Sequence, residues 1–176
     1  MLELDLNFKC DIEAIESMNT IYSLEDFKST EEIETFIAYL CLNIDMMGKA
    51  EFCLSINHSK LSFSWCPTLL YFLTELPLII NSIDCHELEK YTIILDPEVN
   101  EWELIFDRSR KKRTAIIQFD DREGKIVKTE ITSKELKEKF NFLIKKFINL
   151  INKIFPDLLK IKIFHQWTVS SLYETF

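Results

Sequence analysis

Residues 125–155 read KIVKTEITSKELKEKFNFLIKKFINLINKIF. The first seven residues are rich in β-branched side chains, so a strand is expected over 125–131. Thr132-Ser-Lys-Glu135 then forms a capping box, in which a hydroxyl and a carboxylate satisfy backbone N–H groups at the start of a helix. Apolar residues follow at spacings of three and four, which predicts a helix over 133–155. Such helices, together with the strand patterns described next, predict an α+β fold.

The residues before this stretch carry further strand patterns. Segments 91–96, 101–107 and 113–120 are separated by turn compositions such as Asp121-Arg122-Glu123-Gly124. Together with 125–131 they predict a meander over 91–131. In the first half of the chain, alternating apolar residues predict strands at 2–10, 50–56 and 60–65. We therefore expect a mixed or antiparallel sheet.

Two more helices are expected before the meander. Ser29-Thr-Glu-Glu32 is a second capping box, and an apolar stripe follows it to about residue 46. Pro67 stands at the first position of a strongly apolar segment, which predicts a buried helix over 67–83. Pro77 should kink or divide that helix. About three helices would then pack on the sheet, in a single domain over 1–176.

Charge is divided along the chain. Residues 1–107 contain 21 Asp and Glu against 5 Lys, whereas residues 108–176 contain 16 Lys and Arg against 8 acidic residues. The net charges are −16 and +8, which give the total of −8. Such asymmetry bears on the choice of partners and on association rates rather than on the fold.

Composition argues against several classes of protein. The chain has only two glycines, Gly48 and Gly124, so neither a dinucleotide fingerprint nor a phosphate-binding glycine loop can be written. The sequence therefore indicates no cofactor. The N-terminus lacks the pattern of a signal peptide, and the longest apolar stretch is too polar to span a bilayer, so we expect a cytoplasmic protein that does not enter a membrane. Five scattered cysteines are expected to be reduced thiols.

The sequence offers few candidates for catalysis or metal binding. Its three histidines are isolated, and no metal-binding spacing of His and Cys occurs. Cys66, just before the expected helix 67–83, is the best candidate for a nucleophile, because a helix N-terminus can stabilise a thiolate. Its apolar neighbours Trp65 and Pro67 favour burial as a small hydrophobic residue instead.

The basic run 108–113 contains Arg108, Arg110, Lys111, Lys112 and Arg113 and falls on an expected turn of the meander. Such a run could contact phosphates. However, the chain is acidic as a whole and the run contains no aromatic residue for base stacking. We therefore favour a solvated hairpin tip and do not expect nucleic-acid binding.

A possible protein-binding site lies beside the first hairpin of the meander. Glu98, Glu101 and Glu103 stand close together there, and Trp102 lies between two of them. Acidic residues beside an aromatic anchor suit recognition of a basic partner. These four residues are the predicted partner-binding residues, although a tryptophan such as Trp102 is more often part of the core.

In its overall organisation the chain resembles the immunity proteins of bacterial polymorphic-toxin and contact-dependent growth inhibition systems. The resemblance rests on Trp65-Cys66-Pro67 before an apolar helix, on Glu101-Trp102-Glu103-Leu104, and on the closing helix 133–155. It implies a small, acidic, cofactor-free cytoplasmic protein that binds and neutralises one cognate toxin. A nuclease toxin would present a cationic cleft complementary to a negative surface.

Two alternatives belong to other classes. The protein could be a regulatory or adaptor protein that uses 108–113 to bind nucleic acid or an acidic partner. It could also be a cysteine hydrolase, which would require a concave pocket that holds a Cys–His pair.

Overall fold

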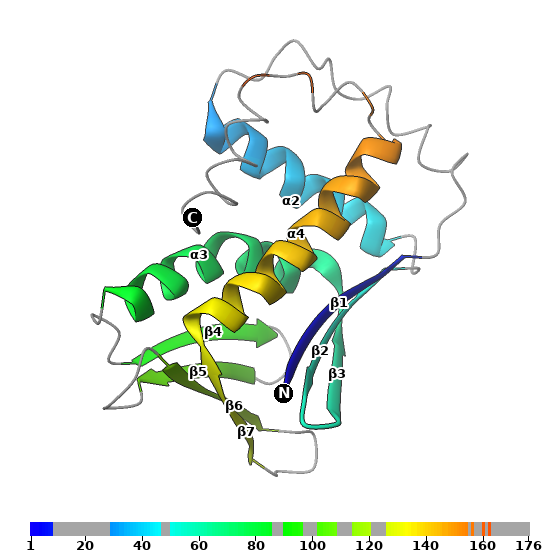
Figure 1. Ribbon diagram of the computed structural model, residues 1–176. Coiled ribbons are helices and arrows are strands. Elements are labelled where there is room, and N and C mark those ends of the chain that lie inside the picture. The colour runs from blue at the N-terminus through cyan, green and yellow to red at the C-terminus, as the bar shows by residue number, and fades with distance from the viewer. Residues whose placement is uncertain are drawn as a thin grey trace.

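The computed structural model describes residues 1–8, 29–46, 50–85, 90–96, 102–108, 114–120 and 126–154, and the single positions 156, 160 and 162. Within these residues the chain forms three α-helices and seven strands (Figure 1). The first half contains β1 (Leu2–Phe8), α2 (Thr30–Met46), β2 (Ala50–Ile56), β3 (Ser59–Phe63), the π-helical turn η2 (Trp65–Leu69) and α3 (Leu70–Asp84). The second half contains β4 (Lys90–Asp96), β5 (Trp102–Arg108), β6 (Thr114–Asp120), β7 (Ile126–Thr132) and α4 (Ser133–Ile154).

The strands form two antiparallel sheets. β4, β5, β6 and β7 pair in sequence order, which confirms the predicted meander. β1, β2 and β3 form a separate three-stranded sheet, in which Leu2 lies opposite Ile56 and Phe52 lies opposite Phe63. The predicted α+β fold with about three helices is therefore confirmed.

A tight turn joins β2 to β3. Ile56 pairs with Ser59, so the loop consists of Asn57 and His58 alone. Both residues have positive φ, at 48° and 77°. Positive φ at both central residues matches the right-handed twist of the flanking strands, and asparagine tolerates this conformation better than most residues.

Both capping boxes are present at the predicted places. The Ser29 hydroxyl accepts the Glu32 N–H at 3.2 Å, and the Glu32 carboxylate accepts the Ser29 N–H at 3.1 Å. At the start of α4, Thr132 and Glu135 make the same reciprocal pair at 3.1 and 2.9 Å. The starts of α2 and α4 are thus determined by residues within one helical turn.

Of the two effects expected of Pro77 on the helix 67–83, a kink or a division, the structure excludes the division. Pro77 does not divide it, because α3 runs as one element from Leu70 to Asp84. A proline inside a helix costs about 3 kcal/mol. Six side chains of α3 are buried, which offsets this cost by packing: Phe72, Leu73, Leu76, Ile79, Ile80 and Ile83. Before Pro67, Cys66 has φ −104° and ψ 128°, the extended conformation that a residue preceding proline prefers.

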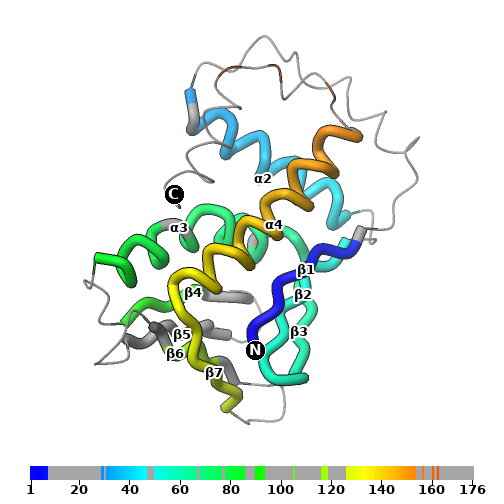
Figure 2. Tube along the Cα trace, viewed as in Figure 1, coloured from blue at the N-terminus to red at the C-terminus, as the bar shows by residue number. Residues whose placement is uncertain are grey.

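One apolar core joins the helices to both sheets. α4 contacts β1 of the first sheet and β7 of the second, and it also packs against α3 (Figure 2). Trp65 and Phe147 lie at the centre, with their ring centroids 6.2 Å apart. Phe52 and Phe72 form a second pair at 4.7 Å. Helix α2 lies on the side of the molecule away from the second sheet (Figure 1).

Candidate protein-binding surface

Helix α2 has two faces of different chemistry. Its inner face is buried and consists of Ile33, Phe36, Ile37, Leu40, Cys41 and Ile44. Its outer face consists of exposed residues at helical spacing: Glu31, Glu34, Thr35, Tyr39, Leu42 and Met46. We call this second set the α2 outer face.

Large apolar side chains occupy the C-terminal half of the α2 outer face. Tyr39, Leu42 and Met46 are 37, 46 and 78 % exposed. Single exposed apolar residues are ordinary in folded proteins, but residues at i, i+3 and i+7 lie together on one side of a helix. Tyrosine and methionine are both enriched at the centre of protein interfaces.

The N-terminal half of the α2 outer face is negatively charged. Glu31 and Glu34 are exposed there, and residues 30–46 contain neither lysine nor arginine. The surface therefore combines an acidic end with an apolar end. It suits a partner that presents cationic groups beside an apolar pocket.

Asp45 holds the C-terminal end of α2 in place. Its carboxylate accepts the backbone N–H of Trp65 at 2.6 Å and also that of Cys66. Burial raises the pKa of Asp45, and the two backbone hydrogen bonds act in the opposite direction. These hydrogen bonds join the C-terminal end of α2 to the start of η2, so the residues of the α2 outer face near that end lie on a helix that is fixed to the rest of the protein.

Two of the four predicted partner-binding residues, Glu98 and Glu101, lie outside the described residues. Trp102 and Glu103 are the first two residues of β5, which lies between β4 and β6 in the second sheet. Trp102 lies opposite Asp96, and Glu103 lies opposite Ile94. Their role in binding stays a prediction.

Sequence patterns missed Tyr39, Leu42 and Met46. The available signal was the surplus of apolar residues in 30–46, because the buried stripe uses only part of them. The remaining large ones recur at spacings of three and four on the opposite side.

The described cysteines and histidine occupy separate parts of the fold. Cys41, Cys53, Cys66 and Cys85 carry free thiols. Burial raises the pKa of the Cys41 thiol, which keeps it protonated. Cys66 is partly buried beside Asp45, whereas His58 lies in the β2–β3 turn. His86 and His165 lie outside the described residues, and the described part of the chain contains no cluster of three metal-ligating side chains.

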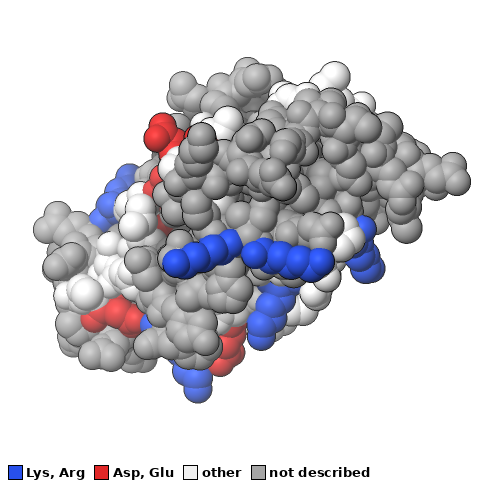
Figure 3. Space-filling view, turned by 90° about the horizontal axis from the view of Figure 1, so that it is seen from above, with Lys and Arg blue, Asp and Glu red and all other residues white. Residues whose placement is uncertain are grey.

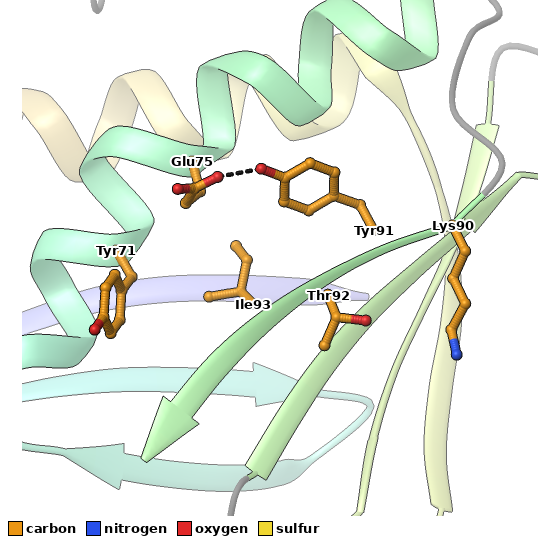
Figure 4. Close-up of a pocket in the computed structure, with 6 residues that line it drawn as sticks. All are labelled: Tyr71, Glu75, Lys90, Tyr91, Thr92 and Ile93. Carbon is orange, nitrogen blue, oxygen red and sulfur yellow. Dashed lines mark hydrogen bonds between the residues drawn. The ribbon is translucent and has the colours of Figure 1, made fainter. Parts of the chain in front are cut away.

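A pocket of about 400 Å³ lies between α3 and β4 (Figure 4). Its described lining is Tyr71, Glu75, Lys90, Tyr91, Thr92 and Ile93, so the Cys–His pair that a cysteine hydrolase requires is not among them. The Tyr91 hydroxyl donates to the Glu75 carboxylate. This hydrogen bond, with burial and the Glu75 charge, raises the pKa of Tyr91 to about 12.

A basic surface lies on α4, on another part of the molecule. Lys134, Lys145 and Lys153 are exposed there. Lys146 pairs with Asp5 and lies 4.9 Å from the Phe142 ring centroid. Figure 3 shows several Lys and Arg side chains near the middle of the molecule as it is seen from above. Of the predicted basic run, Arg108 ends β5 and 109–113 lie outside the described residues.

No protein-family model, curated protein or solved structure matches this chain. Within the described residues, none of the helices combines the length and the apolar character that a bilayer-spanning segment needs.

Proposed function

We propose that this protein is an immunity protein, which binds one cognate bacterial toxin and neutralises it by protein–protein contact. The α2 outer face carries the proposal, because it brings exposed carboxylates and exposed large apolar side chains together. The acidic first 107 residues, at a net −16, favour a cationic target such as the nucleic-acid cleft of a nuclease toxin.

The two halves of the α2 outer face have different expected roles. Carboxylates such as Glu31 and Glu34 would attract a cationic partner over several ångströms and raise the association rate. Tyr39 and Leu42 would be buried in the complex and slow its dissociation. Glu98, Glu101, Trp102 and Glu103 remain proposed contributors to binding.

The partner is sought first by affinity capture from the native host, and a neighbouring gene for a large secreted protein would favour a toxin. The captured protein is then tested for toxicity, and coexpression with this chain should restore growth. Capture of a protein that does not inhibit growth, or toxicity that coexpression leaves unchanged, argues against the proposal.

Binding kinetics then test the surface. The double variant Glu31→Lys/Glu34→Lys should lower the association rate by about tenfold at low salt and flatten its salt dependence. Tyr39→Ala should mainly raise the dissociation rate, by about tenfold. Glu51→Lys, at an exposed position of β2, is the matched control. Wild-type kinetics in both the Glu31→Lys/Glu34→Lys variant and the Tyr39→Ala variant would exclude the α2 outer face as the interface.

A further inference from the structure

The pocket between α3 and β4 runs along the edge of a strand. Four consecutive residues of β4 line it, Lys90 to Ile93. Side chains alternate between the two faces of a strand, so four consecutive lining residues are consistent with a hollow that reaches around the strand's edge. Figure 4 agrees, because Tyr91 and Ile93 point toward α3 whereas Lys90 and Thr92 point to the other side of β4.

Among the strands that the structure describes, β4 also lies at the edge of its sheet, because it pairs with β5 alone. In an antiparallel ladder, alternate residues direct their N–H and C=O groups away from the partner. The open side of β4 therefore presents backbone donors and acceptors to the pocket, which is the surface onto which another strand can add.

Apolar side chains border the same hollow. Ile93 is buried at its base, and Tyr71 of α3 is 37 % exposed at its rim. Leu78, one helical spacing beyond Glu75 on α3, is 52 % exposed but is not part of the described lining. A helix on one side and a strand edge on the other form a groove, and its exposed apolar rim favours alternate apolar side chains in the occupant.

Two charged residues of opposite sign lie on the two sides of the groove. Glu75 projects from α3 on one side and bonds Tyr91, and Lys90 lies at the first residue of β4 on the other face of the strand (Figure 4). An occupant complementary to both would carry a basic side chain on the α3 side and an acidic one near Lys90. Four residues of β4 span about 13 Å, which is enough to pair with a short extended segment.

We propose that this groove binds an extended polypeptide segment, which pairs with the free edge of β4 and places alternate apolar side chains between α3 and Ile93. The site is distinct from the α2 outer face and requires neither the toxin nor its neutralisation. It would give the protein a second binding activity, directed at unfolded or strand-forming peptide.

Two blocked hexapeptides serve as probes, with the orders Glu-Val-Thr-Val-Thr-Lys and Lys-Thr-Val-Thr-Val-Glu. In each, the valines and the lysine share one side of the extended chain. Fluorescence polarisation should show saturable binding of at least one of the two peptides, with a Kd below about 1 mM. Hydrogen exchange should then show slower exchange at amides within 90–93 when the peptide is bound. Absence of saturable binding for both orders would overturn the proposal.

Backbone pairing has an internal control. N-methylation of both valines blocks hydrogen bonding on one edge of the peptide, and N-methylation of both threonines blocks the opposite edge. One set should abolish binding and the other should leave it within about twofold, because only one edge faces β4. Equal affinities for both sets would mean that the peptide docks by its side chains, and that result would refute strand addition.

Matched tyrosine variants locate the site. Tyr71 and Tyr39 have the same exposure of 37 %, but Tyr71 lines the groove and Tyr39 lies on α2. Tyr71→Ala should weaken peptide binding by about tenfold, whereas Tyr39→Ala should leave it unchanged. Glu75→Gln should weaken binding of the peptide, whose lysine faces Glu75, and should reduce the salt dependence of that binding. Equal effects of the two tyrosine variants on peptide binding would contradict the proposal. It would also be contradicted if light scattering showed a dimer and the β4 amides were already protected from exchange without peptide.

Discussion

Asp45 illustrates how one side chain joins two elements that are distant in sequence. Its carboxylate lies near the end of α2 and accepts the backbone N–H groups of Trp65 and Cys66. Backbone N–H groups that are withdrawn from water without a partner cost about 1–3 kcal/mol each. Asp45 removes that cost at the kink before Pro67, where the helical hydrogen-bond pattern is interrupted.

Tyr91 and Glu75 form a second bond of this kind, between β4 and α3. The pKa of Tyr91 is about 12 in the folded protein against 10.0 for an unperturbed tyrosine, chiefly because its hydroxyl donates to Glu75. A raised pKa contributes stability that is fully present below pH 10 and is lost as the pH rises through about 12.

We expect Tyr91→Phe to remove this loss of stability between pH 10 and 12. An absorbance titration of tyrosine ionisation should lose the step at the highest pH in Tyr91→Phe. In Glu75→Gln the same step should move toward pH 10, because the Tyr91 hydroxyl no longer donates to a carboxylate. Tyr39→Phe controls for the loss of one tyrosine. A late step that persists in Tyr91→Phe would show that another tyrosine is responsible.

At the scale of elements, helix ends follow local chemistry and helix interiors follow packing. Both capping boxes form at the residues that the sequence predicts. Pro77, in contrast, does not divide α3, because the packing of that helix on the core outweighs a missing hydrogen bond. The difference is one of range, since a cap depends on four successive residues and a buried helix on the whole core.

The capping box of α4 allows a stability prediction. Thr132→Ala should lower the free energy of unfolding by about 1 kcal/mol, because the Glu135 N–H loses its acceptor. The hydrogen bonds from Thr132 lower the pKa of Glu135, so its contribution is present at neutral pH and is lost as the pH falls through the folded-state value. Glu135→Gln should therefore destabilise the protein more at pH 7 than near pH 3.

Urea denaturation at the two pH values measures both effects. Lys134→Ala, at the exposed position between Thr132 and Glu135, is the control and should change stability by less than about 0.5 kcal/mol. A destabilisation by Glu135→Gln that is independent of pH would contradict the role assigned to the carboxylate.

At the scale of the whole molecule, the acidic first half and the basic second half of the chain meet in two ion pairs, Lys137–Asp84 and Lys146–Asp5. α2 carries Glu31 and Glu34 on its outer face, and α4 carries Lys134, Lys145 and Lys153. The acidic surface favours a cationic partner. The basic surface and the run 108–113 raise the question of nucleic acid.

We expect no stable nucleic-acid binding at physiological salt. The run 108–113 contributes +5 to a total of −8, so the remainder of the chain carries a net −13, which repels a polyanion. The few phosphate contacts available would give an affinity that falls steeply with salt. Fluorescence polarisation with RNA and DNA at about 0.15 M salt should therefore show no submicromolar binding.

The quadruple variant Arg110→Ala, Lys111→Ala, Lys112→Ala and Arg113→Ala is the diagnostic control. Submicromolar binding that this variant abolishes would refute the prediction and favour an adaptor that uses the basic hairpin. Submicromolar binding that the variant retains would refute the prediction too, and would assign the contact to the lysines of α4.

Local patterns were sufficient to predict much of the fold from the sequence. The capping boxes, the apolar periodicities and the turn compositions predict the helices 30–46 and 133–155 and the meander 91–131, and the structure confirms them. These signals depend on residues within one or two turns of each other, so they can be read from a single sequence. The acidic character of the first 107 residues is likewise a property of composition.

Only the tertiary structure decided which strands pair and which apolar residues stay exposed. β1 pairs with β2 across more than forty residues of sequence and forms a sheet separate from the meander. Tyr39, Leu42 and Met46 stay exposed, because they lie on the side of α2 that does not meet the core. Strand pairing and burial depend on contacts between distant segments, and a helix's own periodicity cannot show whether both of its apolar sides find a neighbour.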